Sequence, residues 1–272
     1  MATEPFPMEQ KLRENPTIAP GLHFVEAAPS FPAAIPRLPL RAKLRGDVLR
    51  LRNQLGGVLL RAGLQHSEFT VLSNDCWGQA LYEGYELPCQ TPFVGAGMHA
   101  DCFLRFLGDI EGYLRSPLRF VSETRYLAVR RLRSQRATQK GPWPIAMLGD
   151  DLEVHFLHSE TADEARRAWD AGYERLNLKR IAVKFSADKD GATDEHIRRF
   201  AALPFERKLL ISRQSLPDIS CAVQTPDYVI NGAAMFRRSI KYFDCTHWLN
   251  TGEVCRNTPR VWAGKAIFAR GV

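Results

Sequence analysis

Serine, asparagine, aspartate and cysteine side chains gather in the segment Ser73-Asn74-Asp75-Cys76, which follows a short apolar run. A helical pattern begins directly afterwards at Trp77. A thiol at a helix N-terminus lies near free backbone N–H groups, which lower its pKa and can hold an oxyanion. The sequence therefore predicts Cys76 as a nucleophile or oxyanion contributor in acyl transfer. Asn74 and the N–H groups that follow it would form the oxyanion hole.

The same segment also has a purely structural interpretation. The negative charge of Asp75 opposes a thiolate at the neighbouring residue. Asn74 or Asp75 would then be a helix N-cap, and Cys76 a small buried hydrophobe. In the catalytic interpretation, Ser73 and Trp77 are candidates for contact with a substrate.

A second polar group lies in the alternating segment 152–158, which holds two histidines and an acid. His158 ends the run, and because histidine titrates near neutral pH we predict it as the general base. Glu153 and His155 share the other face of the strand. If both faces are covered, these two side chains are buried and need partners. They are candidates for substrate contact or for a structural pair.

A third group follows another apolar run, where Ser186 is a candidate for substrate contact. Asp188 and Asp190 resemble the aspartate pair with which many glycosyltransferases hold a metal ion and a nucleotide diphosphate. The same residues fit an Asx turn closed by Gly191. A metal site at Asp188 and Asp190 is therefore only an alternative, and the sequence predicts no other metal site.

Strand-like and helical segments alternate along the chain. This pattern predicts an α/β fold with a mostly parallel sheet and helices on both faces (Rossmann-like), as one domain or two α/β subdomains. The expected strands are 69–72, 92–94, 118–121, 144–148, 152–158, 181–185 and 209–212, and the expected helices 77–84, 101–114, 162–176 and 194–202. Ligands bind outside the carboxyl ends of strands in such sheets. The three polar groups are therefore expected on one side.

The flanking segments differ in composition from the centre. We predict a proline-rich, extended or disordered arm at 1–36, a basic amphipathic helix at 37–63, the α/β domain at 64–255 and a C-terminal tail at 256–272. The formal net charge of +7 is concentrated in segments 37–61 and 115–140. Segment 37–61 would either pack on the domain or rest on an anionic membrane. Segment 115–140 is either solvated or lies over phosphates, and without interleaved aromatics no nucleic-acid partner is expected.

Composition excludes several classes of protein. With 45% hydrophobic and 25% charged residues, disorder throughout is excluded. No apolar run is long enough to span a membrane, and the N-terminus does not resemble a secretory signal. Six cysteines without CxxC pairs argue against a disulfide scaffold and a structural zinc site. The expected location is the cytoplasm, at the inner face of the membrane if the basic helix binds lipid.

Three short segments of the chain occur in the same order as in a known protein family. Ser-Asn-Asp-Cys-Trp-Gly at 73–78, Thr-Pro-Phe-Val-Gly at 91–95 and Glu-Val-His-Phe-Leu-His at 153–158 resemble a bacterial family of unknown function. Its members are often labelled exopolysaccharide or capsular polysaccharide biosynthesis proteins. The resemblance covers about residues 45–250. It implies an α/β fold and a link to surface-polysaccharide assembly.

Three functional hypotheses follow. The first is a transferase that modifies a sugar or lipid-linked glycan by acyl transfer, with an acyl-CoA as donor. The second is a glycosyl- or glycosyl-phosphate transferase that uses a nucleotide sugar with Mn²⁺ or Mg²⁺ at Asp188 and Asp190. The third is a non-catalytic scaffold that docks to a membrane or partner through the basic helix.

Overall fold

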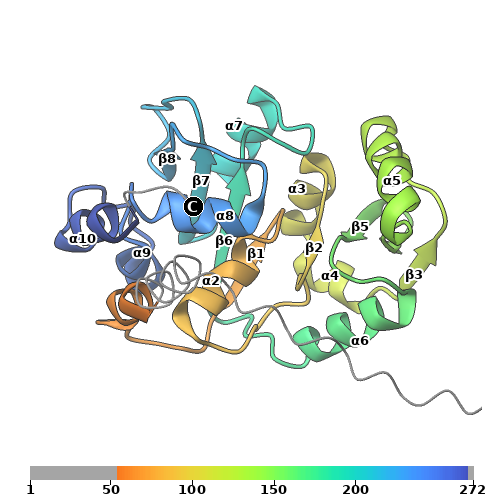
Figure 1. Ribbon diagram of the computed structural model, residues 1–272, viewed down its shortest axis with the longest axis horizontal. Coiled ribbons are helices and arrows are strands. Elements are labelled where there is room, and N and C mark those ends of the chain that lie inside the picture. Colours follow the sequence, from red (N-terminus) through yellow and green to blue (C-terminus); the bar gives the residue numbers. More distant parts are fainter. Residues whose placement is uncertain (1–53, 269–272) are drawn as a thin grey trace, which may run out of the picture.

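The computed structural model describes residues 54–268, which form two four-stranded sheets (Figure 1). The parallel sheet has the strand order β1 (Thr70–Ser73), β6 (Ile181–Ser186), β7 (Arg207–Ser212) and β8 (Ala222–Gln224). The antiparallel sheet has the order β2 (Ala96–Gly97), β5 (Leu152–Phe156), β4 (Ile145–Leu148) and β3 (Leu118–Val121).

The α/β class is confirmed, but one mostly parallel, Rossmann-like sheet is not what the structure shows. Strands β2 to β5 form a separate antiparallel sheet. Only residues 149–151 separate β4 from β5. A parallel crossover needs a dozen residues or more, whereas a short turn produces an antiparallel hairpin. Gly149, with φ of 60°, lies in this turn. The length of the connection therefore decides the pairing.

The parallel sheet is covered on both faces. Helices α2 (Trp77–Tyr85), α8 (Gly232–Ser239) and α9 (Cys245–Thr251) share one core with Val71, Leu209 and Ile211. Helices α3 (Ala100–Gly108) and α7 (Asp194–Ala202) share the other core with Leu72 and Phe185. This second core includes the antiparallel sheet, and Figure 1 shows α3 between the two sheets.

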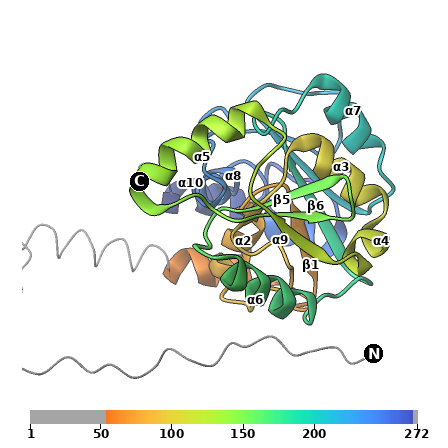
Figure 2. The same ribbon diagram turned by 90° about the vertical axis from the view of Figure 1, so that its right-hand side faces the viewer.

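The described residues contain further helices, and no helix among the described residues is long and apolar enough to cross a bilayer. They are α4 (Ile110–Arg115), α5 (Leu127–Lys140), α6 (Ala162–Tyr173) and α10 (Pro259–Phe268). The basic segment 115–140 contains β3 and α5, and α5 lies on the outside of the molecule (Figure 2). Residues 54–61 are helical. The predicted arm at 1–36 and residues 37–53 of the basic helix lie outside the described residues.

Several predicted elements need correction. No strand forms at 92–94, where the chain makes a turn, and the adjacent strand is Ala96–Gly97. The expected helix 101–114 is divided at Asp109, whose carboxylate accepts a hydrogen bond from the Gly112 amide and so begins α4. The segment 256–272, predicted as a tail, contains the helix α10.

Candidate functional site

A buried carboxylate organises the carboxyl end of the parallel sheet. Strands β1 and β6 are neighbours and end at Ser73 and Ser186, so both hydroxyls reach the same edge. The Asp75 carboxylate accepts hydrogen bonds from Ser73 Oγ (2.9 Å), Ser186 Oγ (3.0 Å) and Lys184 Nζ (2.8 Å). Its Oδ1 also accepts the Trp77 amide at 3.0 Å. The loop that carries Cys76 is thereby fixed to β6.

The pKa values of two carboxyl groups at this end of the sheet, those of Asp75 and Asp190, shift in opposite directions. Burial alone would raise the pKa of Asp75, but Lys184 and Lys189 together hold this pKa well below its usual range. Lys189 Nζ lies 3.6 Å from Asp75 and 3.4 Å from Asp190. Burial raises the pKa of Asp190 to about 6. The edge therefore holds a carboxyl group that titrates close to neutral pH.

Cys76 and His158 lie next to each other, and Cys76 directly follows Asp75. The distance from Cys76 Sγ to His158 Nε2 is 3.5 Å. The thiol is buried, whereas the His158 side chain is exposed. The His158 amide donates to Gly95 O at 3.2 Å, and a Cβ at Gly95 would lie 2.8 Å from His158 Cβ. Gly95 has φ of 63°, so glycine is needed there on two grounds.

The environment of Cys76 differs from the sequence-based expectation. Burial, followed by the charge of Asp75, raises the pKa of the Cys76 thiol to about 11. Cys76 is the N-cap residue of α2, yet the helix terminus does not lower this pKa as predicted. The thiol is therefore protonated at neutral pH, and attack by its sulfur requires a base at the same place.

Two other predicted residues, Asn74 and Trp77, lie on either side of Asp75 and Cys76. Asn74 Oδ1 accepts the Ser186 amide at 3.0 Å, whereas Asn74 Nδ2 is buried and has no hydrogen-bond partner within residues 54–268. Trp77 is fully buried, and its indole donates to Ser239 at 3.1 Å. The Trp77 amide is already bonded to Asp75. Among the donors expected for an oxyanion hole, the Asn74 side chain therefore offers an N–H group with no partner in the described residues.

Comparison with known proteins assigns this chain to a family. The family model described as "Domain of unknown function (DUF1919)" matches residues 50–250. The chain belongs to the DUF1919 family. An uncharacterised protein of Haemophilus influenzae (strain Rd) is 29% identical over 189 residues, which cover 70% of this chain and 81% of that protein. The prediction of a bacterial family of unknown function is confirmed, and the DUF1919 match includes Cys76 and His158.

Glu153 and His155 form a separate buried group in the DUF1919 domain. Glu153 Oε2 accepts hydrogen bonds from the backbone and side chain of Arg125, at 3.0 and 3.2 Å. His155 Nδ1 accepts the Trp143 indole N–H at 3.3 Å, and its Nε2 lies 3.5 Å from Glu153 Oε1. Burial lowers the pKa of His155 to about 4. The structure thus groups these two residues with Arg125 and Trp143, away from Cys76.

The two aspartates of the alternative metal site are engaged in other contacts. Asp188 is exposed, and its Oδ2 accepts the Arg213 amide at 2.7 Å. Asp190 is paired with Lys189, and a lysine ammonium competes with a cation for the carboxylate. Gly191, with φ of 73°, closes the loop. These contacts describe a turn that is held by a hydrogen bond to Arg213 and by an ion pair with Lys189.

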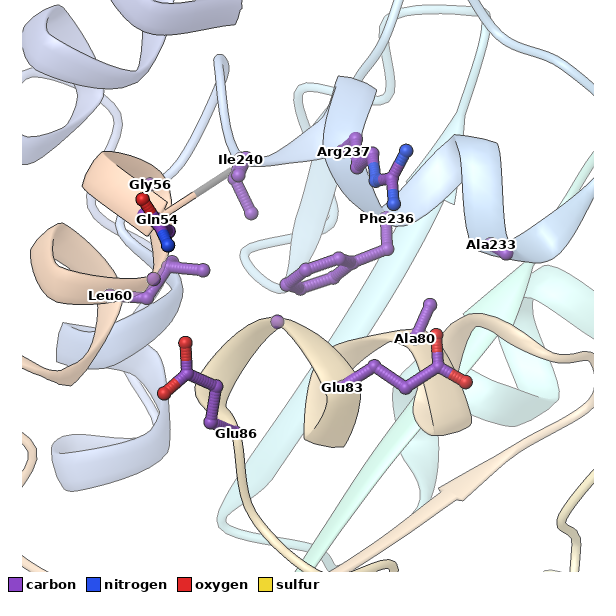
Figure 3. Close-up of a pocket in the computed structure, with 12 residues that line it drawn as sticks. Gln54, Gly56, Leu60, Ala80, Glu83, Glu86, Ala233, Phe236, Arg237 and Ile240 are labelled. Atoms are coloured by element: carbon purple, nitrogen blue, oxygen red, sulfur yellow. The ribbon is translucent and has the colours of Figure 1, made fainter. Parts of the chain in front are cut away.

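A cavity of about 300 Å³ lies between residues 54–60, α2 and α8 (Figure 3). Ala80 and Ala233 lie at one end and Leu60 at the other, with the Phe236 ring between them. The Ala80 amide donates to Cys76 O, so Ala80 lies one helical turn after Cys76. Gly84 allows Phe236 to approach α2, because a Cβ there would lie 2.6 Å from the ring.

Lys184, Lys189 and the central position of Asp75 were not predicted from the sequence. One signal was present in the sequence. Lys184 interrupts the apolar run of β6, and a lysine in a strand covered on both faces requires a buried anionic partner. The identity of that partner depends on the pairing of β1 with β6, which is a tertiary contact.

Proposed function

We propose that this DUF1919 protein is an acyltransferase of surface polysaccharide biosynthesis that works through the Cys76 thiol. The observation that carries the proposal is the 3.5 Å distance between Cys76 Sγ and His158 Nε2 at the carboxyl end of a parallel sheet. A nucleophile and a base within hydrogen-bonding reach are the minimal arrangement for covalent catalysis. The acceptor class, a sugar or lipid-linked glycan, rests on the sequence resemblance.

The proposed reaction has two half-steps. In the first, His158 Nε2 takes the thiol proton while Cys76 Sγ attacks the thioester carbonyl of an acyl-CoA. The C–S bond of the donor breaks, and the departing CoA sulfur takes the proton from His158. In the second, a sugar hydroxyl attacks the Cys76 thioester, and His158 moves the hydroxyl proton to the departing Cys76 sulfur. The products are a sugar ester, free CoA and the original thiol.

The raised pKa of Cys76 explains why His158 is needed. With a pKa of about 11 the free thiolate is present at pH 7 in only about one molecule in 10⁴. General-base removal of the proton during attack avoids this low population. Asn74 Nδ2, a buried donor without a partner among the described residues, would donate to the carbonyl oxygen as its negative charge develops.

The cavity beside α2 is the proposed place for the arm of the donor. Its volume of about 300 Å³ lies at the lower end of the range for small-ligand pockets. The wall formed by Ala80, Ala233 and Phe236 is apolar, and it begins one turn of α2 from Cys76. The same proposal includes contact between the basic segment 37–61 and an anionic membrane. This contact would bring a lipid-linked acceptor close to the site.

The test is detection of the acyl-enzyme by intact-protein mass spectrometry after incubation with acetyl-CoA. We expect one acetyl group on Cys76, none in Cys76→Ser, and formation slowed by about 10²–10⁴-fold in His158→Gln. Cys89→Ser is the matched control, because Cys89 is a half-buried thiol whose pKa is also raised by burial. Acetylation that persists in Cys76→Ser would overturn the proposal.

A second measurement tests the acceptor. Cells that carry Cys76→Ser should produce surface polysaccharide with reduced acyl content, whereas Cys89→Ser should leave this content unchanged. Unchanged acylation in Cys76→Ser cells would remove the glycan from the proposal. Turnover of a nucleotide sugar that depends on Mn²⁺ or Mg²⁺ and survives Cys76→Ser would instead favour the glycosyltransferase hypothesis.

A further inference from the structure

A second group of reactive side chains lies at the end of α9, apart from the Cys76 site. The helix begins at Asp244, whose Oδ1 accepts the His247 amide at 2.9 Å. It ends at Gly252, which adopts φ of 84° and donates its amide to Trp248 O at 2.8 Å. This left-handed residue turns the chain back along the helix that it has just left.

Two hydrogen bonds fix the segment 253–255, which runs back along the helix. The Glu253 amide donates to Thr251 Oγ1 at 3.1 Å, and the Asp244 amide donates to Cys255 O at 2.8 Å. As a result the imidazole of His247, the carboxylate of Glu253 and the thiol of Cys255 each place a ligand atom within 4.8 Å of the others. The distance from His247 Nε2 to Glu253 Oε2 is 3.5 Å.

We propose that His247, Glu253 and Cys255 bind a zinc ion. In tetrahedral zinc sites the Zn–N and Zn–O distances of about 2.0–2.1 Å and the Zn–S distance of about 2.3 Å separate the ligand atoms by about 3.3–3.6 Å. The His247–Glu253 distance of 3.5 Å equals such an edge. A ceiling of 4.8 Å on the other pairs lets small side-chain rotations close the site.

An unsatisfied nitrogen supports the assignment. His247 Nε2 is buried, and no hydrogen-bond partner for it occurs among the described residues. At 3.5 Å the Glu253 carboxylate is too far for a good hydrogen bond to this atom, yet an ion between the two would satisfy both. Within residues 54–268, His247, Glu253 and Cys255 form a group of His, Cys, Asp or Glu side chains with the spacing of a metal site.

The donor set favours zinc. Imidazole nitrogen, thiolate sulfur and carboxylate oxygen are the three ligand types that Zn²⁺ accepts in tetrahedral geometry. Three protein ligands leave a fourth position for water or an external group, and the exposure of Glu253 leaves that position open to solvent.

The site is distinct from the candidate acyltransfer site. Gly252 lies against Glu206 O, immediately before β7 begins at Arg207, so the end of α9 is at the amino end of the parallel sheet. Cys76 and Ser186 lie at the carboxyl end. We therefore assign the ion a stabilising role, in which it holds the segment before α10 against α9. No zinc site was expected here from the sequence, because Cys255 belongs to no CxxC pair and has no recognised ligand spacing to a histidine.

The test is metal binding to the full chain after removal of metal with a chelator. Zn²⁺ titrated against a chromophoric chelator should bind with a stoichiometry of one per chain. Co²⁺ should give the absorption bands of a tetrahedral complex together with a sulfur-to-cobalt charge-transfer band. Cys255→Ser should abolish that band, and His247→Gln or Glu253→Gln should weaken binding by at least about tenfold. Zn²⁺ should also raise the melting temperature of the wild type.

Matched variants make the outcome decisive. Cys89→Ser and His66→Gln alter a half-buried thiol and an exposed imidazole outside the group, and should bind Zn²⁺ as the wild type does. Cys76→Ser should also retain Zn²⁺, which separates this proposal from the acyltransfer proposal. Absence of stoichiometric binding by the wild type would overturn the site. Binding that survives Cys255→Ser unchanged, or a Co²⁺ spectrum without the sulfur band, would overturn it as well.

Discussion

Replacement of Lys184 by methionine should destabilise the protein by about 3–5 kcal/mol. Lys184 is fully buried and lies 2.8 Å from Asp75, so the substitution leaves a buried carboxylate without its closest cation. Removal of one partner of a buried ion pair typically costs about 3–5 kcal/mol. Lys189, at 3.6 Å from Asp75, offsets part of this loss, so we expect a value near the lower end. Against a total stability of about 5–15 kcal/mol this is a large fraction.

The assay is urea unfolding at pH 7, followed by tryptophan fluorescence and far-ultraviolet circular dichroism. Lys179→Met is the control, because Lys179 is exposed and its substitution should change stability by less than about 0.5 kcal/mol. The double variant Lys184→Met/Asp75→Asn should lose less than the sum of the two single variants, since it removes both charges. A loss below about 1 kcal/mol for Lys184→Met, or strict additivity in the double variant, would refute the role of this pair.

The pH dependence gives an independent check on the same pair. The folded-state pKa of Asp75 lies below its unfolded value, so the carboxylate stabilises the fold above about pH 4, and this contribution is lost as the pH falls further. Without Lys184 the folded-state pKa of Asp75 rises. The acid-side loss of stability should therefore be smaller in Lys184→Met than in the wild type.

Two further predictions concern the titration of His155 and the packing around two helical glycines. Because the pKa of His155 is about 4 when folded and near 6.5 when unfolded, the unfolded chain takes up the proton first, and stability should fall by about 2 kcal/mol between pH 7 and pH 5. His155→Gln should reduce this difference in urea unfolding, and an unchanged difference would contradict the assignment. Gly172→Ala should destabilise by about 1–3 kcal/mol, because its Cβ would lie 2.2 Å from Thr91 O. Gly108→Ala meets no atom within 4 Å and should stabilise by about 0.4–1 kcal/mol, so thermal melts of the two variants should move in opposite directions.

Local patterns identified many elements from the sequence. The strand at 118–121 and the helix at 194–202 have the predicted bounds, because a short strand-like run and an amphipathic pattern are local signals. Strand β8 and helices α8 to α10 were not predicted. β8 has three residues, and its pairing with β7 joins segments that are separated in the chain. No periodicity in so short a run distinguishes it from a loop.

The candidate site was only partly accessible to the same reasoning. Cys76, His158 and Ser186 were expected on one side because their strands were predicted to belong to one mostly parallel sheet. The structure does bring Cys76 and His158 to 3.5 Å, but His158 follows a strand of the antiparallel sheet. The pKa of Cys76 was expected to be lowered by the helix terminus. It is raised instead, because burial and the charge of Asp75 outweigh that effect.

One short segment explains how Cys76, the proposed nucleophile, and His158, the proposed base, come from two sheets to the same point. Strand β2 pairs with β5, and the Met98 amide immediately after it donates to Asn74 O at 3.0 Å. At its other end, Gly95 O accepts the His158 amide at 3.2 Å. Segment 95–98 therefore bonds to the loop that carries Cys76 and to the residue that carries the imidazole. Backbone hydrogen bonds thus hold the two residues that carry the sulfur and the nitrogen next to each other, which is the placement that the proposed proton transfer requires.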